Sequence, residues 1–414
     1  MRILHLADLH FGKSIYGVSL LESGDQPHWV GSLLEKVEAI RPDAVVIAGD
    51  VYDRSAPSGD AVQLCSRMLT GLHRLGVPVM LVAGNHDSVQ RLSFAGDMLS
   101  REGVHIAPDL FESKRLARVT LTDAWGDVDF WLMPYVFPAL VERALGLEDL
   151  RDYDAAVRAL LARQDVDFTR RNVLVAHQNV TANGAEAERG GSESMVGGVG
   201  QVDYTAFDGF DYVALGHIHA ACQVGRDTVR YAGSPLCYHF EETRQRAKGP
   251  LLVEIGRKGA PVRIETIHIP PLHPLRRLRG AYEAIRDEAI NSSGRNEYAS
   301  VTLTDRRVGT EEAYFLRELF ESRGGRLLEL TSEYMRDAGA SGAPSSGTVE
   351  RKRVDELFED FYAQSLRGET PDDRTRALLR LAGEALSRAD VHAAPDNDAV
   401  QGLLDALERG GVEL

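Results

Sequence analysis

The strongest constraint on the fold is a series of short apolar runs, each of which ends in a cluster of polar residues. The runs are rich in β-branched residues and span residues 3–7, 44–48, 79–83, 173–176 and 212–215. Runs this short and branched are typical of buried strands. Amphipathic patterns typical of helices lie between them, at residues 29–40, 61–75 and 89–99. The alternation predicts a layered α/β domain in which helices cover a sheet core and ligands gather beyond the carboxyl ends of the strands.

The pattern changes at residues 269–274, where three prolines interrupt regular structure. We therefore place a first domain at residues 1–269 and a second, smaller domain at 270–337. The second has a short α+β pattern, with helices expected at residues 280–289 and 311–321 and strands at 298–303 and 326–330.

A stretch rich in Gly, Ala, Ser and Pro at residues 337–347 has the composition of a flexible linker, which we place at 338–350. Residues 351–414 are charged and helical in pattern, with further helices expected near 373–387 and 399–408. One apolar helix face is formed there by Val354, Leu357, Phe358, Phe361 and Tyr362. This face either packs on its own domain or docks a partner.

Composition excludes some classes of protein. A net charge of −15 argues against a simple DNA-coating protein, although bound cations and a partner can supply positive charge to a nuclease. The three cysteines form no Cys-x-x-Cys pair, so neither a disulfide framework nor a zinc knuckle is expected. The sequence shows no secretory signal and no apolar run of the roughly 20 residues that cross a bilayer, which favours a cytoplasmic location.

Five polar clusters carry the chemistry, and each follows an apolar strand: residues 8–10, 49–53, 84–87, 176–178 and 216–219. The two-residue period of extended chain lets Asp8 and His10 point to one side. Ligands of the Asp, His and Asn types without thiolate suit Mn²⁺, Fe²⁺ or Zn²⁺. Alone, the pair His217 and His219 is a moderate metal signal and the other clusters are weak ones. Together they predict a dinuclear site, in which two ions about 3.5–4 Å apart clamp a phosphate and activate water.

In these clusters the chain resembles the calcineurin-like metallophosphoesterase superfamily. The pattern D-x-H, G-D, G-N-H-[DE], H and G-H-x-H is present in full. Residues 5–13, 48–53 and 231–236 narrow the resemblance to the bacterial nuclease subunits of that superfamily. The resemblance implies a layered metallophosphoesterase sandwich with a small α+β capping domain at 270–337 and C-terminal helices.

The resemblance also implies roles for individual residues. Asp8, His10 and His219 would bind one ion, and Asn85, His177 and His217 would bind the other. Asp50 would bridge the two ions. His86 would face the substrate phosphate and assist the transition state or the leaving oxygen. Asp53 is a second catalytic candidate, and Asp87 would lie outside the ligands.

The implied function is that of a DNA nuclease with two Mn²⁺ ions, or Fe²⁺ or Zn²⁺ in their place. Such subunits act as double-strand exonucleases (3′–5′) and as single-strand or hairpin endonucleases in replication, recombination and repair. ATP would bind an SMC-like ATPase partner, since this chain has no Gly-x-x-x-x-Gly-Lys-[Ser/Thr] loop. Two alternatives remain: a small-molecule phosphodiesterase or protein phosphatase of the superfamily, or a non-catalytic DNA-tethering subunit.

Contacts to DNA and partners are expected in four places. Arg276, Arg277 and Arg279 form a basic cluster that either contacts phosphates or belongs to a solvated helix face. Lys13 and Tyr16 are candidates for contacts to the DNA backbone, and the lack of a base-reading motif predicts binding independent of sequence. By resemblance, the apolar face of residues 354–362 would dock the coiled-coil base of the ATPase. Also by resemblance, the helices at 61–75 and 89–99 would form the contact of a homodimer, which would be part of a heterotetramer.

Overall fold

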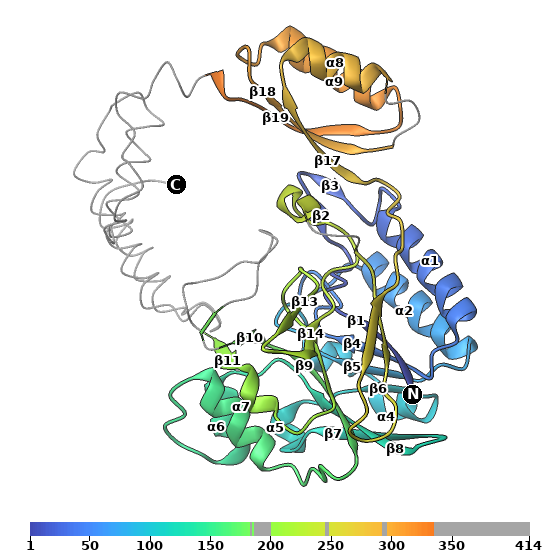
Figure 1. Cartoon of the computed structure of the whole chain (residues 1–414), viewed down its shortest axis with the longest axis vertical. Helices are drawn as coiled ribbons and strands as arrows, with labels where there is room; N and C mark the ends of the chain where they lie inside the picture. The colour runs from blue at the N-terminus through green and yellow to red at the C-terminus, as the bar shows by residue number, and fades with distance from the viewer. Residues whose placement is uncertain (183, 186–199, 245–247, 292–295, 335–414) are drawn as a thin grey trace, which may run out of the picture. The chain divides into compact units, whose positions relative to one another are not determined.

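The computed structural model describes residues 1–182, 184–185, 200–244, 248–291 and 296–334 (Figure 1). The predicted linker and the helical region with Val354, Leu357, Phe358, Phe361 and Tyr362 lie outside this part of the chain. Among the described residues, no helix is both long and apolar enough to cross a membrane.

Two six-stranded sheets form the frame of the first domain. The first has the order β16 (Arg263–Thr266), β15 (Leu251–Glu254), β1 (Arg2–Leu6), β4 (Ala44–Ala48), β5 (Val79–Val82) and β6 (Val104–Ile106). The second has the order β13 (Cys222–Val224), β14 (Arg226–Tyr231), β12 (Tyr212–Gly216), β9 (Arg171–His177), β8 (Gly126–Met133) and β7 (Ala117–Asp123). Strands β1, β4, β5 and β6 run parallel, as do β8, β9, β12 and β14.

The two sheets pack face to face, and helices cover their outer faces. Alternate residues of each strand point to opposite sides of a sheet, so Ile3 and Val46 meet Phe130 and Val173 of the second sheet in one core. Leu4 and its outward neighbours pack instead against α1 (Asp25–Ile40) and α2 (Gly59–Arg74). On the far side, α6 (Pro138–Leu145) and α7 (Tyr153–Ala162) cover the second sheet (Figure 1). The α/β sandwich expected from the sequence is confirmed.

The remaining elements of this domain are short. They are the strand pairs β2 (Ser14–Ile15) with β3 (Val18–Ser19) and β10 (Asn179–Thr181) with β11 (Gln201–Asp203), the helix α5 (Leu110–Ser113), and the 3-10 turns η1 (Tyr204–Phe207) and η2 (Phe240–Arg244). The segment 89–99, predicted as one helix, is two: α3 (Val89–Leu92) and α4 (Gly96–Arg101). The break lies at Ala95, whose φ of 57° is left-handed and ends helical hydrogen bonding.

The described residues of the predicted capping domain form a parallel three-stranded sheet with two helices. The domain contains β17 (Leu275–Gly280), α8 (Tyr282–Asn291), β18 (Tyr298–Leu303), α9 (Thr310–Glu321) and β19 (Arg326–Ser332). The basic cluster 276–279 lies on strand β17, so the alternative of a helix face is wrong. A hydrogen bond between His273 Nδ1 and Asp25 Oδ2, at 2.9 Å, links this region to the first domain.

Candidate metal centre

The polar clusters meet where the carboxyl ends of parallel strands from both sheets come together. Asp8 and His10 follow β1, Asp50 follows β4, and Asn85 and His86 follow β5. From the second sheet, His177 ends β9, and His217 and His219 follow β12. Because β1, β4 and β5 are neighbours in one sheet and β9 and β12 in the other, the topology brings all five clusters to one edge of the sandwich.

The backbone at this edge is strained. Asp8, His10, Asp50 and His217 have φ values of 54°, 43°, 50° and 109°, in the left-handed region that non-glycine residues rarely adopt. Such conformations persist only where the surrounding structure holds them, and they gather at functional sites. Here several hydrogen bonds hold them, including those from Asp8 N to Gly49 O and from His10 N to Asp50 O, at 3.0 and 2.9 Å.

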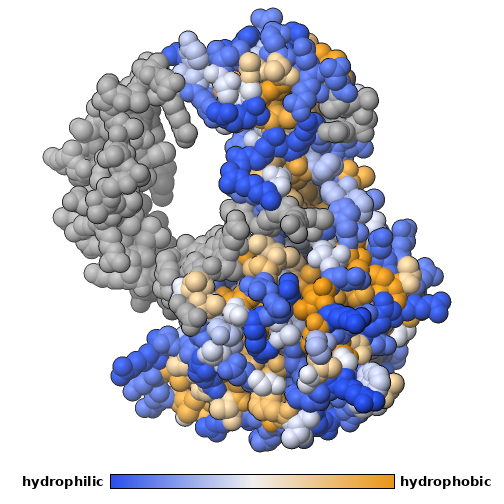
Figure 2. Space-filling view, in the orientation of Figure 1, coloured by the Kyte–Doolittle hydropathy of each residue, from blue (hydrophilic) through white to orange (hydrophobic). Residues whose placement is uncertain are grey.

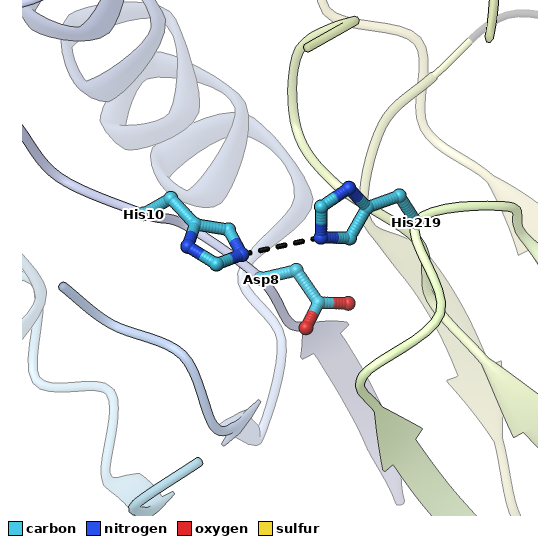
Figure 3. Close-up of side chains that lie close together, drawn as sticks. All are labelled: Asp8, His10 and His219. Atoms are coloured by element: carbon cyan, nitrogen blue, oxygen red, sulfur yellow. Dashed lines mark hydrogen bonds between the residues drawn. The ribbon is translucent and has the colours of Figure 1, made fainter. Parts of the chain in front are cut away.

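One group of side chains is formed by Asp8, His10 and His219, which point toward one another in Figure 3. All three are buried, and Nε2 of His10 lies 3.2 Å from Nε2 of His219. Nδ1 of His10 lies 3.5 Å from a carboxylate oxygen of Asp53, and Nδ1 of His219 lies 3.6 Å from one of Glu242. A nearby carboxylate favours the tautomer with the hydrogen on Nδ1, which leaves a lone pair on each Nε2. Two facing lone pairs beside a carboxylate fit a cation between them.

A second group is formed by Asn85, His177 and His217. Oδ1 of Asn85 lies 2.9 Å from Nε2 of His177 and 3.0 Å from Nδ1 of His217. Nδ1 of His177 donates to the Ala48 carbonyl at 2.8 Å, which leaves Nε2 as the lone-pair atom. Burial lowers the pKa of His177, which favours the neutral ring that metal binding requires.

Asp50 lies between the two groups. Its Oδ2 atom is 3.5 Å from Nε2 of His10 and also 3.5 Å from Nε2 of His177. Its Oδ1 atom accepts the backbone N–H of His86 at 2.9 Å, which orients the carboxylate. Burial alone would raise the pKa of Asp50, but the nearby His177 and His10 and the N–H of His86 lower it, so the carboxylate is ionised. The donor set and its geometry fit two divalent cations that share this carboxylate.

The open side of the centre carries His86. The side chains of His86 and His217 are half-buried and Asn85 is exposed, whereas Asp8, His10, Asp50 and His177 are buried. Nδ1 of His86 donates to the backbone carbonyl of Asp53 at 2.9 Å, and its ring packs edge-on against His10. Nε2 of His86 is thus the ring atom left for a substrate.

Two acidic residues support the loops. Asp53, predicted as catalytic, places its carboxylate beside His10 Nδ1 and accepts from Lys13 Nζ at 2.9 Å. Asp87 accepts backbone N–H groups of Gly84, Val51 and Tyr52 at 2.9, 3.1 and 2.9 Å, and so ties the loop after β5 to the loop after β4.

Three residues that the sequence did not single out contact this centre: Tyr238, Glu242 and Lys248. Lys248 Nζ donates to a Glu242 oxygen at 2.7 Å and to the His219 carbonyl at 2.9 Å. The Tyr238 hydroxyl lies 2.8 Å from the Leu9 carbonyl oxygen. Only the neighbouring motif at 231–236 carried a signal, because Glu and Lys in a polar loop have no distinctive pattern.

The residues predicted to contact DNA are held by other parts of the chain. Lys13 is paired with Asp53, and Tyr16 stacks on His239. The viewed face of the capping domain is mostly hydrophilic (Figure 2), but its arginines have partners within the chain. Arg276 pairs with Glu288 and Glu297, Arg277 with Glu241, and Arg279 with Glu333. A DNA phosphate at this strand would compete with these carboxylates.

The sandwich and its cluster of Asp, His and Asn side chains define a class, that of metal-dependent phosphoesterases. The chain belongs to the calcineurin-like phosphoesterase family, whose model matches residues 1–221. It is also similar to the SbcD component of the nuclease SbcCD from Staphylococcus saprophyticus, with 29% identity over 373 residues, which cover 89% of this chain and 94% of that protein. Residues 271–365 match the model of the type 5 capsule protein repressor C-terminal domain. The expected resemblance to bacterial nuclease subunits is confirmed.

Proposed function

We propose that this chain is an SbcD-type nuclease subunit that hydrolyses DNA phosphodiester bonds with two Mn²⁺ ions. The observation that carries the proposal is the position of the Asp50 carboxylate, 3.5 Å from a nitrogen of each ligand group. A shared carboxylate between two histidine-containing groups is the arrangement that holds paired ions. Nitrogen ligands favour Mn²⁺ over the harder Mg²⁺, with Fe²⁺ or Zn²⁺ as substitutes.

The ligand sets are those that the family resemblance implied. Asp8, His10 and His219 would hold one ion, Asn85, His177 and His217 the other, with Asp50 between them. When bound, the ions polarise the phosphate, activate a water molecule and stabilise the leaving oxygen.

His86 is the side chain that we expect to act on the substrate directly. The Asp53 carbonyl fixes Nδ1–H, so the protonated ring can donate from Nε2 to a phosphate oxygen or to the departing 3′ oxygen. Asp53 therefore acts through others: its carbonyl orients His86 and its carboxylate orients His10. We assign it a positioning role in catalysis.

The substrate and partners follow from the similarity to a component of SbcCD. We propose double-strand exonuclease (3′–5′) and single-strand or hairpin endonuclease activity, together with the SMC-like ATPase SbcC, in DNA replication, recombination and repair in the cytoplasm. A homodimer within a heterotetramer would use α2 and the α3–α4 segment. Phe94 and Met98 in that segment are 80% and 71% exposed, which suits a buried contact.

The test compares substrates on metal-free protein reloaded with Mn²⁺. We expect cleavage of an end-labelled DNA hairpin, loss of cleavage in chelator, and weaker recovery with Mg²⁺. Hydrolysis of a cyclic nucleotide in preference to the hairpin would instead indicate a small-molecule phosphodiesterase. Mn²⁺ binding without any hydrolysis would indicate a tethering subunit.

A further inference from the structure

The described residues between Ser234 and Lys248 pack against residues that we propose as ligands of one ion. The Tyr238 hydroxyl lies 3.1 Å from the carbonyl oxygen of Asp8, and its ring meets the rings of His10 and His219 edge-on. Lys248 donates to the His219 carbonyl. The described part of this segment therefore touches Asp8, His10 and His219, which all belong to the first ligand group.

Glu242 is the charged centre of this segment. It is 1% exposed, and one carboxylate oxygen lies 3.6 Å from Nδ1 of His219. The other oxygen accepts from Lys248 Nζ at 2.7 Å and from the Tyr238 backbone N–H at 3.1 Å. These two contacts hold the buried carboxylate in place behind the imidazole of His219.

A buried ion pair of this kind adds little to the stability of the fold. Desolvation of both charges offsets their attraction, and an apolar pair of similar volume is often as stable or more so. A carboxylate behind a metal-binding imidazole has a different effect. It keeps the hydrogen on Nδ1, fixes the plane of the ring and raises the basicity of Nε2.

We propose that Glu242, anchored by Lys248, is a positioning residue that aims Nε2 of His219 at the ion shared with Asp8 and His10. The proposal rests on the dinuclear site proposed above. His177, in the other ligand group, donates its Nδ1 hydrogen to the Ala48 backbone carbonyl instead. Loss of Glu242 should therefore weaken one ion and spare the other.

The experiment measures Mn²⁺ binding to metal-free full-length protein, with free Mn²⁺ followed by EPR. The main variant is Glu242→Leu with Lys248→Met, which removes the carboxylate without leaving an unpaired buried charge. Glu242→Gln keeps an oxygen acceptor behind the ring. Glu241→Gln is the matched control, because the half-buried carboxylate of Glu241 pairs with Arg277 and Arg244 rather than with His219.

We expect the wild type and Glu241→Gln to bind two ions alike. The double variant should keep the unfolding temperature of the metal-free wild type but bind one ion about 10–100-fold more weakly, as losses of such outer partners typically do. Glu242→Gln should show a smaller loss at the same ion. Wild-type affinity for both ions in the double variant would overturn the proposal. If the double variant does not fold, wild-type affinity in Glu242→Gln would overturn it. A wild type that binds no Mn²⁺ would overturn the dinuclear site itself.

Discussion

At the scale of single residues, the contacts of each imidazole indicate whether the histidine can bind a metal ion or belongs to the core. His10, His177 and His219 each have Nδ1 beside an acceptor and Nε2 turned toward the centre. His5, which also lies near this edge, has both nitrogens in contact with the protein, at Tyr212 Oη and the Leu215 carbonyl. Burial lowers its pKa to about 3, so His5 is a neutral core residue.

Nδ1 of His86 is likewise held by an acceptor, the Asp53 carbonyl, but we assign its Nε2 to the substrate and not to an ion. Turnover and metal binding should therefore respond differently to its loss. We expect His86→Ala to retain both ions and the fold but to lose about 10²–10⁴-fold in rate, the usual cost of a lost general acid. Asp50→Ala should instead lose the ions. Metal content and single-turnover cleavage measure the two effects, with His73→Ala on the outer helix α2 as control. An emptied site in His86→Ala, or an unchanged rate, would show that this role is wrong.

Residue types and spacing alone were enough to predict which side chains gather at the centre, because each cluster follows a buried strand. The ligand roles themselves stay predictions until ions are seen. Glu242 and Lys248 could not be predicted, since their function depends on a contact with His219 more than twenty positions away in sequence. The pairing of Arg276, Arg277 and Arg279 with carboxylates was hidden for the same reason.

At the scale of elements, the loops after β4 and β5 approach so closely that one of them needs glycine. A Cβ atom on Gly84 would lie 2.1 Å from Asp50 Oδ1 and 2.4 Å from Asp50 N. The backbone atom cannot move aside, so the methyl group would displace the Asp50 carboxylate.

We therefore expect Gly84→Ala to lose most nuclease activity and to bind Mn²⁺ more weakly. The matched control is Gly31→Ala on α1, where an added Cβ meets nothing within 4 Å. That change should leave activity intact and change stability by no more than about 1 kcal/mol. Mn²⁺ titration and thermal unfolding of both proteins are the measurements. Wild-type metal affinity in Gly84→Ala would contradict the assigned role of Asp50.

Secondary-structure elements were predictable where an apolar run or an amphipathic pattern was unbroken. The central strands β1, β4, β5, β9 and β12 appear where apolar runs predicted them. Strand β17 was missed because Leu275–Gly280 carries three arginines, and its partly exposed faces give no apolar alternation. The break at Ala95 was missed because alanine is a good helix former, and tertiary structure imposes its left-handed conformation.

At the scale of the whole molecule, the proposal separates catalysis from assembly. A chain ending at Ala340 should fold and retain Mn²⁺-dependent cleavage of single-stranded DNA, since every candidate ligand lies before residue 220. It should no longer bind SbcC, and ATP-stimulated cutting of duplex ends should be lost. In the full chain, the double substitution Leu357→Glu with Phe358→Glu should also abolish SbcC binding, because it puts charge into an apolar contact. Asp360→Asn, off that face, is the control.

Co-purification of this chain with SbcC measures the assembly effect. An undiminished complex with the shortened chain would place the ATPase contact elsewhere. Insoluble shortened protein would instead favour packing of the apolar face on its own domain.

The central claim is a pair of ions that share the Asp50 carboxylate, and anomalous scattering from crystals soaked in Mn²⁺ tests it most directly. The account predicts two peaks on opposite sides of this carboxylate, one beside His10 and His219 and the other beside His177 and Asn85. A single peak, or two peaks that leave Asp50 without a metal contact, would contradict it.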